Sequence, residues 1–213
     1  MITRSRVGIG LTKAGILLGL AATIGVGIVA GRVLGAQSAE VPPAIQELRE
    51  APNFYVLPAR RPQPLGELVK TVDAVGRVRV ESTTSVKDHT AAGPVAGIET
   101  SWGHVDVKAT VLDVYRGSAV QLSNFAFEAV FELGTDKPAV SAVNPPLRVG
   151  EEYVVFVDDG RVYFPGGTYR VYAGKVWNIG HWIDPTSREY PADLSGLTIA
   201  EAGRTLLAAA SQP

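Results

Sequence analysis

Hydrophobic and polar residues alternate along the stretch from Trp102 to Gly117. The apolar positions are Val105, Val107, Ala109 and Val111, and the polar positions between them are His104, Asp106, Lys108 and Thr110. Successive side chains of a strand point to opposite faces, so this pattern predicts a strand with one buried and one solvated face. The apolar phase changes at Leu112, where we expect a β-bulge that bends the strand.

Shorter segments on both sides of this strand also have strand patterns. We expect strands at 77–81, 127–133, 153–157, 161–164 and 169–177, the last with a bulge at Gly174. Asp158-Asp159-Gly160 lies between two apolar runs and predicts a tight hairpin turn. The polar residues 83–100 and the proline-containing residues 134–150 are expected to form loops.

Three segments have helical patterns. Leu65, Leu68, Val69 and Val72 predict a short helix, and Pro42-Pro43 suits the start of another over 44–50. A capping box at 198–201 predicts a third helix over 199–210. Its apolar face would contain Ile199, Ala202, Gly203, Leu206, Leu207 and Ala210. This face either packs on the sheet or binds a partner protein, and Leu206 and Leu207 are the partner-binding candidates on it.

These elements predict a mainly β protein. We expect a small antiparallel barrel of five or six strands, OB-like, with an N-terminal transmembrane helix and a C-terminal amphipathic helix. The expected domain order is a cytoplasmic N-terminus (1–13), an anchor or signal segment (14–35), a proline-rich tether (36–64), the barrel (65–183) and a C-terminal extension (184–213).

The N-terminal segment predicts contact with a lipid bilayer. Residues 14–31 are 18 residues without a charge, preceded by Arg4, Arg6 and Lys13. Their helical length of about 27 Å approaches that of a hydrocarbon core. The positive flank predicts a cytoplasmic N-terminus, a single pass and an extracytoplasmic main domain. The alternative is a cleaved signal peptide and a secreted protein.

Small residues recur every four positions in this segment, including Gly15, Gly19, Gly27 and Gly31. This spacing lets two membrane helices approach closely, so these glycines are candidates for self-association or for an envelope protein partner. The alternative is that residues 14–35 form an apolar membrane segment without a protein partner.

Composition and charge narrow the function classes. The chain has 213 residues, 46% of them hydrophobic and 19% charged, which suits a globular protein. Residues 1–39 hold four of its 20 bases and no acid, so the remainder has 16 bases against 21 acids. Such a mildly acidic body does not attract nucleic acid. The absence of cysteine excludes disulfides and thiolate chemistry.

Three sequence segments resemble a group of exported bacterial domains with an OB-like or TIMP-like barrel. They are LGELVKTVDAVGRVRV, KATVLDVYRGS and LRVGEEYVVFV, with matching patterns at 73–78, 116–117 and 149–157. The resemblance covers about half of the chain and implies the barrel fold. Inhibition of metalloproteases is not implied, because the cysteines of TIMP-like inhibitors are absent. No helix pattern lies between the third and fourth strands, so the barrel is expected to be open there.

No pattern predicts catalysis, a metal site or a cofactor. The three histidines, His89, His104 and His181, lack the spacing of metal ligands. Adjacent carboxylates at 151–152 and 158–159 point apart or lie on a turn, whereas general acid–base catalysis needs convergent groups. An exported enzyme with an unrecognised metal-dependent or hydrolytic site is the rival hypothesis.

Aromatic residues are the remaining ligand-binding candidates. Tyr169, Tyr172, Trp177 and Trp182 fall within a short segment, and OB-type barrels can stack sugars or bases on such rings. The alternative is that these rings fill the core. Overall, the sequence predicts a membrane-anchored, extracytoplasmic barrel that acts as a binding or assembly module at the cell envelope.

The anchor hypothesis has a direct test. We predict that the full-length chain sediments with membranes and resists carbonate extraction, because residues 14–31 are uncharged and no good cleavage site follows them. A soluble chain whose N-terminus lies near Gln37 or Glu40 would instead show a cleaved signal.

Overall fold

The computed structural model describes residues 40–49, 64–95, 98–132, 147–163, 167–179 and 194–212. The chain divides into two compact units, 1–38 and 39–213. The first unit lies outside the described residues, and with it the whole of the expected anchor at 14–35. Within the described ranges, no helix combines the length and the apolar character that crossing a bilayer requires.

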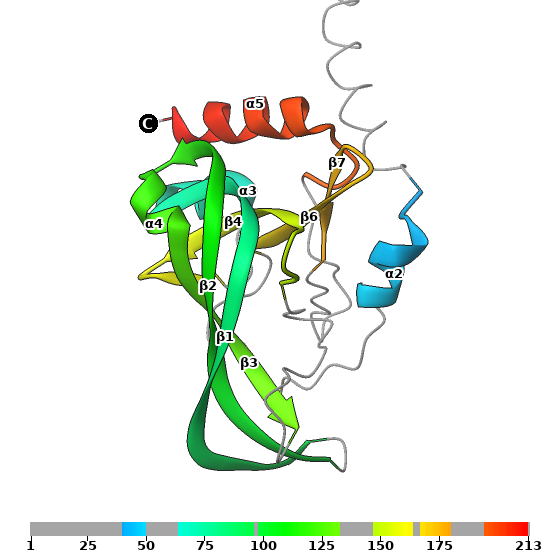
Figure 1. Ribbon diagram of the computed structural model, residues 1–213. Coiled ribbons are helices and arrows are strands. Elements are labelled where there is room, and N and C mark those ends of the chain that lie inside the picture. The colour runs from blue at the N-terminus through cyan, green and yellow to red at the C-terminus, as the bar shows by residue number, and fades with distance from the viewer. Residues whose placement is uncertain are drawn as a thin grey trace, which may run out of the picture. The chain divides into compact units, whose positions relative to one another are not determined.

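The described part of the second unit is mainly β (Figure 1). Its strands are β1 (Ala74–Val95), β2 (Ile98–Arg116), β3 (Asn124–Glu132), β4 (Glu152–Asp158), β5 (Arg161–Val162), β6 (Thr168–Tyr172) and β7 (Lys175–Asn178). They form one sheet in the order β1-β2-β3-β5-β4-β6-β7, and β1 also pairs with β4. Five strands therefore form a partly closed ring, in which one parallel pair, Ala126 with Arg161, joins β3 to β5.

Two strand predictions need correction. Residues 169–177 are two strands, because Ala173 and Gly174 both have positive φ, 50° and 74°, and turn the chain instead of bulging it. Residues 83–95 and 98–100, expected as loop, continue β1 and β2. Thr83 and Thr84 favour extended backbone, and Ser82, Thr83 and Thr84 are all exposed. Periodicity cannot reveal a strand whose side chains are polar on both faces.

Bulges set the course of β1 and β2. The expected bulge is confirmed at Leu112, because Arg77 pairs with Asp113 and Val78 with Val111. A second one is at Glu81, between Val80 and Ser82. Beyond Arg79, β1 is no longer paired with β4. Figure 1 shows β1, β2 and β3 continuing together well past the part of the sheet that contains β4.

Two hydrophobic cores lie on opposite sides of β4. The inner core fills the ring and includes Val78, Val105, Phe127, Tyr153, Val155 and Val157. The outer core includes Leu68, Val69, Val75, Val154, Phe156 and Leu206. Because β4 contributes to both cores, its five central residues are all buried, which explains the continuous apolar run at 153–157.

Four helices are described around the ring. They are α2 (Pro43–Arg49), α3 (Leu65–Thr71), α4 (Ala119–Ser123) and α5 (Ile199–Ala210). The expected helices in the first, second and last of these segments are confirmed. In α2, Ile45 and Leu48 enter the inner core, so this part of the expected tether belongs to the folded unit. The short helix α4 was not predicted from the sequence. It begins at a capping box formed by Ser118 and Gln121 and inserts Leu122 into the inner core.

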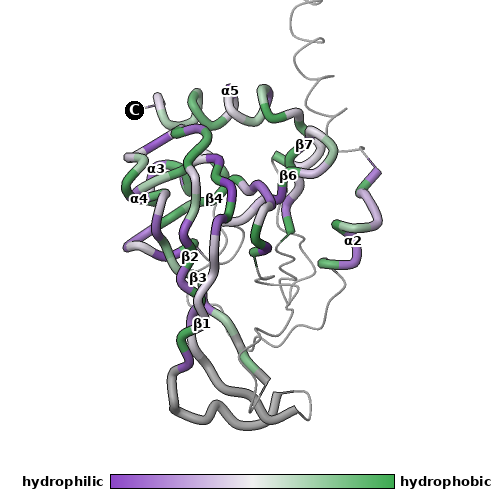
Figure 2. The backbone as a smooth tube through the Cα atoms, viewed as in Figure 1, coloured by the Kyte–Doolittle hydropathy of each residue, from purple (hydrophilic) through white to green (hydrophobic). Residues whose placement is uncertain are grey.

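The C-terminal helix α5 packs on the outer core through Ala202, Leu206 and Ala209. Its Thr198–Glu201 capping box is present, with Glu201 accepting from the backbone N of Thr198 at 3.0 Å. Gly203 leaves room for the ring of Tyr115. The placement of Leu207 on the buried face was wrong, because its side chain is 49% exposed whereas Leu206 is 0% exposed. Figure 2 shows hydrophobic and paler residues alternating along the helix.

This pair of leucines gives a matched stability test. We predict that Leu206→Ala lowers the free energy of unfolding by about 2–5 kcal/mol, because it removes a fully buried side chain from the outer core. Leu207→Ala should change it by less than about 0.5 kcal/mol. Chemical denaturation of both variants measures the difference, and equal losses would contradict the observed face of α5.

Candidate functional site

The outer face of β1, β2 and β3 carries aligned rows of polar side chains. Lys108 lies between Ser82 on β1 and Asn124 on β3, and Asp106 lies between Thr84 and Ala126. Residues of opposite parity on β2 and β3, such as Val105 and Phe127, belong to the inner core. The alternation in the sequence therefore places these polar groups together on one solvated face.

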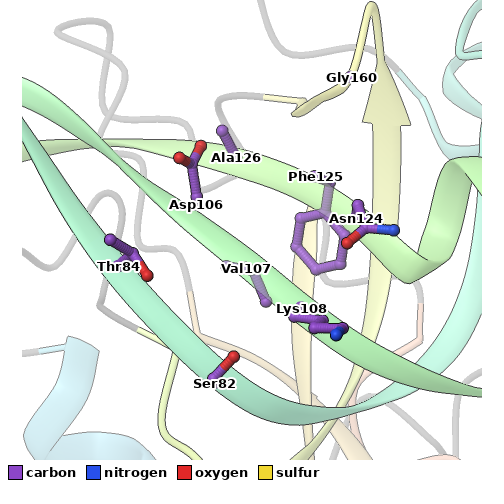
Figure 3. A pocket seen from close by; sticks show the side chains of 9 residues that line it. All are labelled: Ser82, Thr84, Asp106, Val107, Lys108, Asn124, Phe125, Ala126 and Gly160. Carbon is purple, nitrogen blue, oxygen red and sulfur yellow. The ribbon is translucent and has the colours of Figure 1, made fainter.

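A hollow of about 490 Å³ lies on this face (Figure 3). It is lined by Ser82, Thr84, Asp106, Val107, Lys108, Asn124, Phe125, Ala126 and Gly160. Its volume is within the range of small-molecule sites, although its lining is more polar than usual. Val107 and Phe125 are buried, so the groups presented to solvent are hydroxyl, amide, ammonium and carboxylate.

The turn between β4 and β5 forms part of the rim. Asp159 and Gly160 have φ of 51° and 70°, which suits the predicted two-residue hairpin. The backbone N of Asp159 donates to Asp73 Oδ2 at 2.9 Å, and the backbone N of Ala126 donates to Gly160 O at 2.9 Å. These bonds hold the turn against both β3 and the start of β1.

Several polar groups in the hollow have no partner among the described residues. The Lys108 ammonium and the hydroxyls of Ser82 and Thr84 make no hydrogen bond or ion pair there. Asp106 is 59% exposed, and its Oδ1 lies 3.5 Å from His104 Nε2. Beside the hollow, Arg161 Nη1 and Glu128 Oε1 are 3.4 Å apart. Among the described residues, the site therefore offers one cation without an ion pair, Lys108, and one loosely held anion, Asp106.

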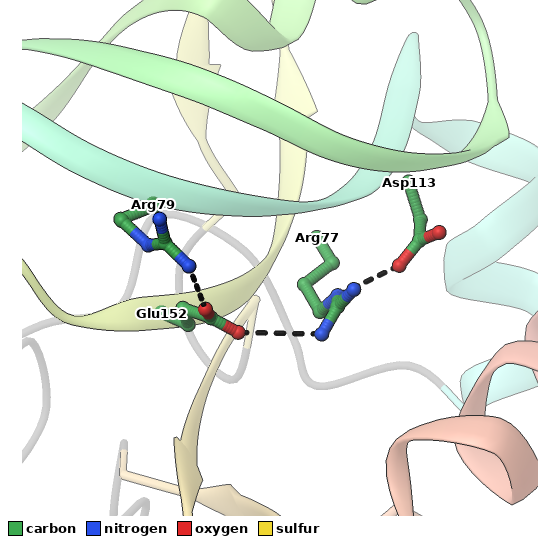
Figure 4. Close-up of polar contacts among 4 residues, drawn as sticks. All are labelled: Arg77, Arg79, Asp113 and Glu152. Atoms are coloured by element: carbon green, nitrogen blue, oxygen red, sulfur yellow. Dashed lines mark hydrogen bonds and ion pairs between the residues drawn. The ribbon is translucent and has the colours of Figure 1, made fainter.

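Elsewhere on the ring, a cluster of charged side chains is paired. Arg77 Nε lies 2.7 Å from Asp113 Oδ2. Arg77 Nη1 lies 3.3 Å from Glu152 Oε2, and Arg79 Nη2 lies 2.7 Å from Glu152 Oε1. Figure 4 shows these four side chains and the contacts that join them. This cluster ties β2, β1 and β4 together. Burial and the neighbouring Asp113 raise the pKa of Tyr115 to about 12.

A second paired cluster lies at the start of β4. Arg170 Nη2 is 2.5 Å from Glu151 Oε1, and the Tyr153 hydroxyl donates to Glu151 Oε2 at 2.6 Å. Burial and this hydrogen bond raise the pKa of Tyr153. The guanidinium of Arg170 also lies 5.5 Å from the ring centre of Tyr172. These groups stabilise one another, which suits a structural role.

The aromatic candidates do not form one exposed platform. Tyr169 is buried in the outer core and Trp177 in the inner core. Tyr172 is 37% exposed and lies against Arg170. Trp182 and the glycine candidates Gly15, Gly19, Gly27 and Gly31 lie outside the described residues. Leu206 is buried, which leaves Leu207 as the exposed member of the helix pair.

The sequence alone predicted only some of the residues that line the hollow. The polar positions Asp106 and Lys108 were recognised as the solvated face of a strand. Ser82 and Thr84 were missed because their segment was predicted as loop, and Asn124 because the third strand was predicted to begin later. Strong β propensity at Thr83 and Thr84 is the signal that could have extended the first strand.

The chemistry of the hollow is limited to the polar groups that line it. Among the described residues, no group of three His, Asp or Glu side chains could hold a metal ion. The free hydroxyls lie beside a carboxylate that contacts a histidine, but no described contact joins a hydroxyl to a base. No protein-family model matches the chain, and no curated protein matches it.

The raised tyrosine pKa predicts sensitivity to alkali. The pKa of Tyr115 is higher in the folded state than in the unfolded state. Its contribution to the free energy of unfolding is therefore complete below pH 10 and is lost as the pH rises from 10 towards 12. We therefore predict falling stability over this range, and a smaller fall in Tyr115→Phe. Denaturant unfolding at pH 9 and pH 11.5 tests this, and equal pH sensitivity of both proteins would contradict it.

Proposed function

We propose that this protein is a membrane-anchored, extracytoplasmic binding module whose hollow on β1, β2 and β3 holds a small polar ligand. The observation that carries the proposal is a set of polar groups that have no partner among the described residues and gather in one hollow of about 490 Å³. A folded protein tends to leave such groups to water or to a ligand, and here they converge from the neighbouring strands β1 and β2.

The strand arrangement supports this location. We propose that the ring is an OB-like barrel, since its strands follow the order β1-β2-β3-β5-β4 and β4 returns to β1. OB-folds bind ligands on the face of their second and third strands, next to the loop between the fourth and fifth. The hollow combines Asp106, Lys108 and Asn124 from that face with Gly160 from that loop.

The lining favours a small ligand over nucleic acid. Single-stranded nucleic acid needs several cations and exposed aromatic rings. The hollow has Lys108 and Asp106 with opposite charges, and its Phe125 is buried. Arg161 beside it is paired with Glu128.

The proposed place in the cell rests on residues 14–35, whose apolar length and basic flank suit a membrane anchor. The folded unit follows closely, since α2 begins at Pro43. Cleavage of the segment would give a secreted binding protein with the same hollow.

The binding proposal can be tested by NMR. We predict that the ¹⁵N-labelled full chain, titrated with a panel of amino acids, dipeptides, saccharides, small carboxylates and amines, shows shifts at the amides of Ser82, Thr84, Asp106, Lys108 or Gly160 for at least one class. Ser82→Trp should abolish these shifts, because the indole would occupy the hollow.

Thr83→Trp is the matched control. Thr83 is also exposed but does not line the hollow, so this variant should bind as the natural chain does. Shifts absent for every class, or equally lost in both variants, would refute a binding site at the hollow.

A further inference from the structure

We propose that the ligand of the hollow is a zwitterion, a free amino acid or short peptide with one carboxylate and one ammonium group. This inference rests on the proposed function and specifies the ligand's chemistry. It starts from the two formal charges in the hollow, Asp106 and Lys108, which are opposite in sign and next to each other on one face of β2.

The two charges are close but are not paired with each other. They are two residues apart on one strand, so their Cα atoms are separated by about 7 Å. Lys108 makes no ion pair among the described residues, and the contact of Asp106 is with His104 at 3.5 Å. A ligand with an ammonium and a carboxylate could lie between them and form a charge-assisted hydrogen bond of about 2.7–2.9 Å at each end.

The polar side chains beside Lys108 and Asp106 also form two rows, one next to each charge. Ser82 and Asn124 flank Lys108 in one row, and Thr84 flanks Asp106 in the other. A hydroxyl can donate to a carboxylate in the first row and accept from an ammonium in the second. Each row therefore suits one charged end of the ligand.

Other polar ligands fit less well. A neutral saccharide would leave both charges without an ionic partner. A simple anion would pair with Lys108 but lie near Asp106, and a simple cation would meet the opposite conflict. A zwitterion is the class in which both charges of the hollow gain a partner.

The test combines probes and charge changes in the full chain. Calorimetric and NMR titrations would use glycine and Ala-Ala as zwitterions, acetate and methylamine as single charges, and glucose as a neutral probe. We expect both zwitterions to bind more tightly than the other three. Lys108→Gln and Asp106→Asn should each weaken zwitterion binding about tenfold or more, because each removes one charge-assisted bond.

A charge exchange provides the decisive variant. In the double variant Asp106→Lys with Lys108→Asp, a zwitterion can bind in the reverse direction, so its affinity should recover to well above that of either single variant. Lys175→Gln is the control, since Lys175 is exposed on β7 and does not line the hollow. Thermal melting of each variant checks that it remains folded.

The outcomes separate this inference from the proposed function. Glucose or a singly charged probe that shifts the hollow amides while glycine and Ala-Ala do not would overturn the zwitterion and keep the binding site. Exchange variants that stay folded without recovery would also overturn it. An absence of shifts with all five probes and with the wider panel would overturn both proposals.

Discussion

Burial of β4 on both of its faces is the constraint on which the rest of this fold depends. Its alternate side chains enter two separate cores, so each core needs the strand in one register. The inner core then requires β1 to close the ring, and the outer core requires α3 and α5 as a cover. A polar residue at any central position of β4 would lie in one core or the other, which explains why this segment has no alternation.

The polar outer face of β1, β2 and β3 does not depend on the burial of β4. Past Arg79, β1 leaves β4 and continues with β2 and β3 as a sheet whose inner face holds the hydrophobic residues of the inner core. The side chains of the outer face do not enter the inner core, so polar residues can stand there without loss of core packing. The hydrophobic core and the proposed binding site therefore lie on opposite faces of the same three strands, and a change at Lys108 need not disturb Val107.

The sequence predicted the parts of this structure that depend on local patterns. The alternation at 105–111, the Asp-Gly hairpin, the bulge at Leu112 and the C-terminal capping box were all predictable from neighbouring residues. Prediction from the sequence failed where the structure depends on contacts between residues far apart in the chain. Polar strand residues at 82–85 carry no periodicity, and Leu207 has the same character as Leu206 although only one of them meets the outer core.

The candidate site shows the same division. Asp106 and Lys108 were visible as polar positions of one strand, but their convergence with Ser82, Thr84 and Gly160 arises from pairing between segments far apart in sequence. The aromatic residues were a misleading signal, because large rings serve a small core as readily as a ligand. Tyr169 on β6 is buried in the outer core, and Trp177 on β7 is buried in the inner core.

The extra residue at Glu81 has a consequence for the charge balance of the outer face. In an unbulged ladder, Glu81 would lie directly opposite Lys108, and their ion pair would neutralise the ammonium. The bulge instead shifts the ladder by one position, so that Ser82 lies opposite Lys108 and Glu81 accepts a hydrogen bond from Thr110. A single inserted residue thus decides whether this lysine is a structural counter-ion or a group open to the solvent.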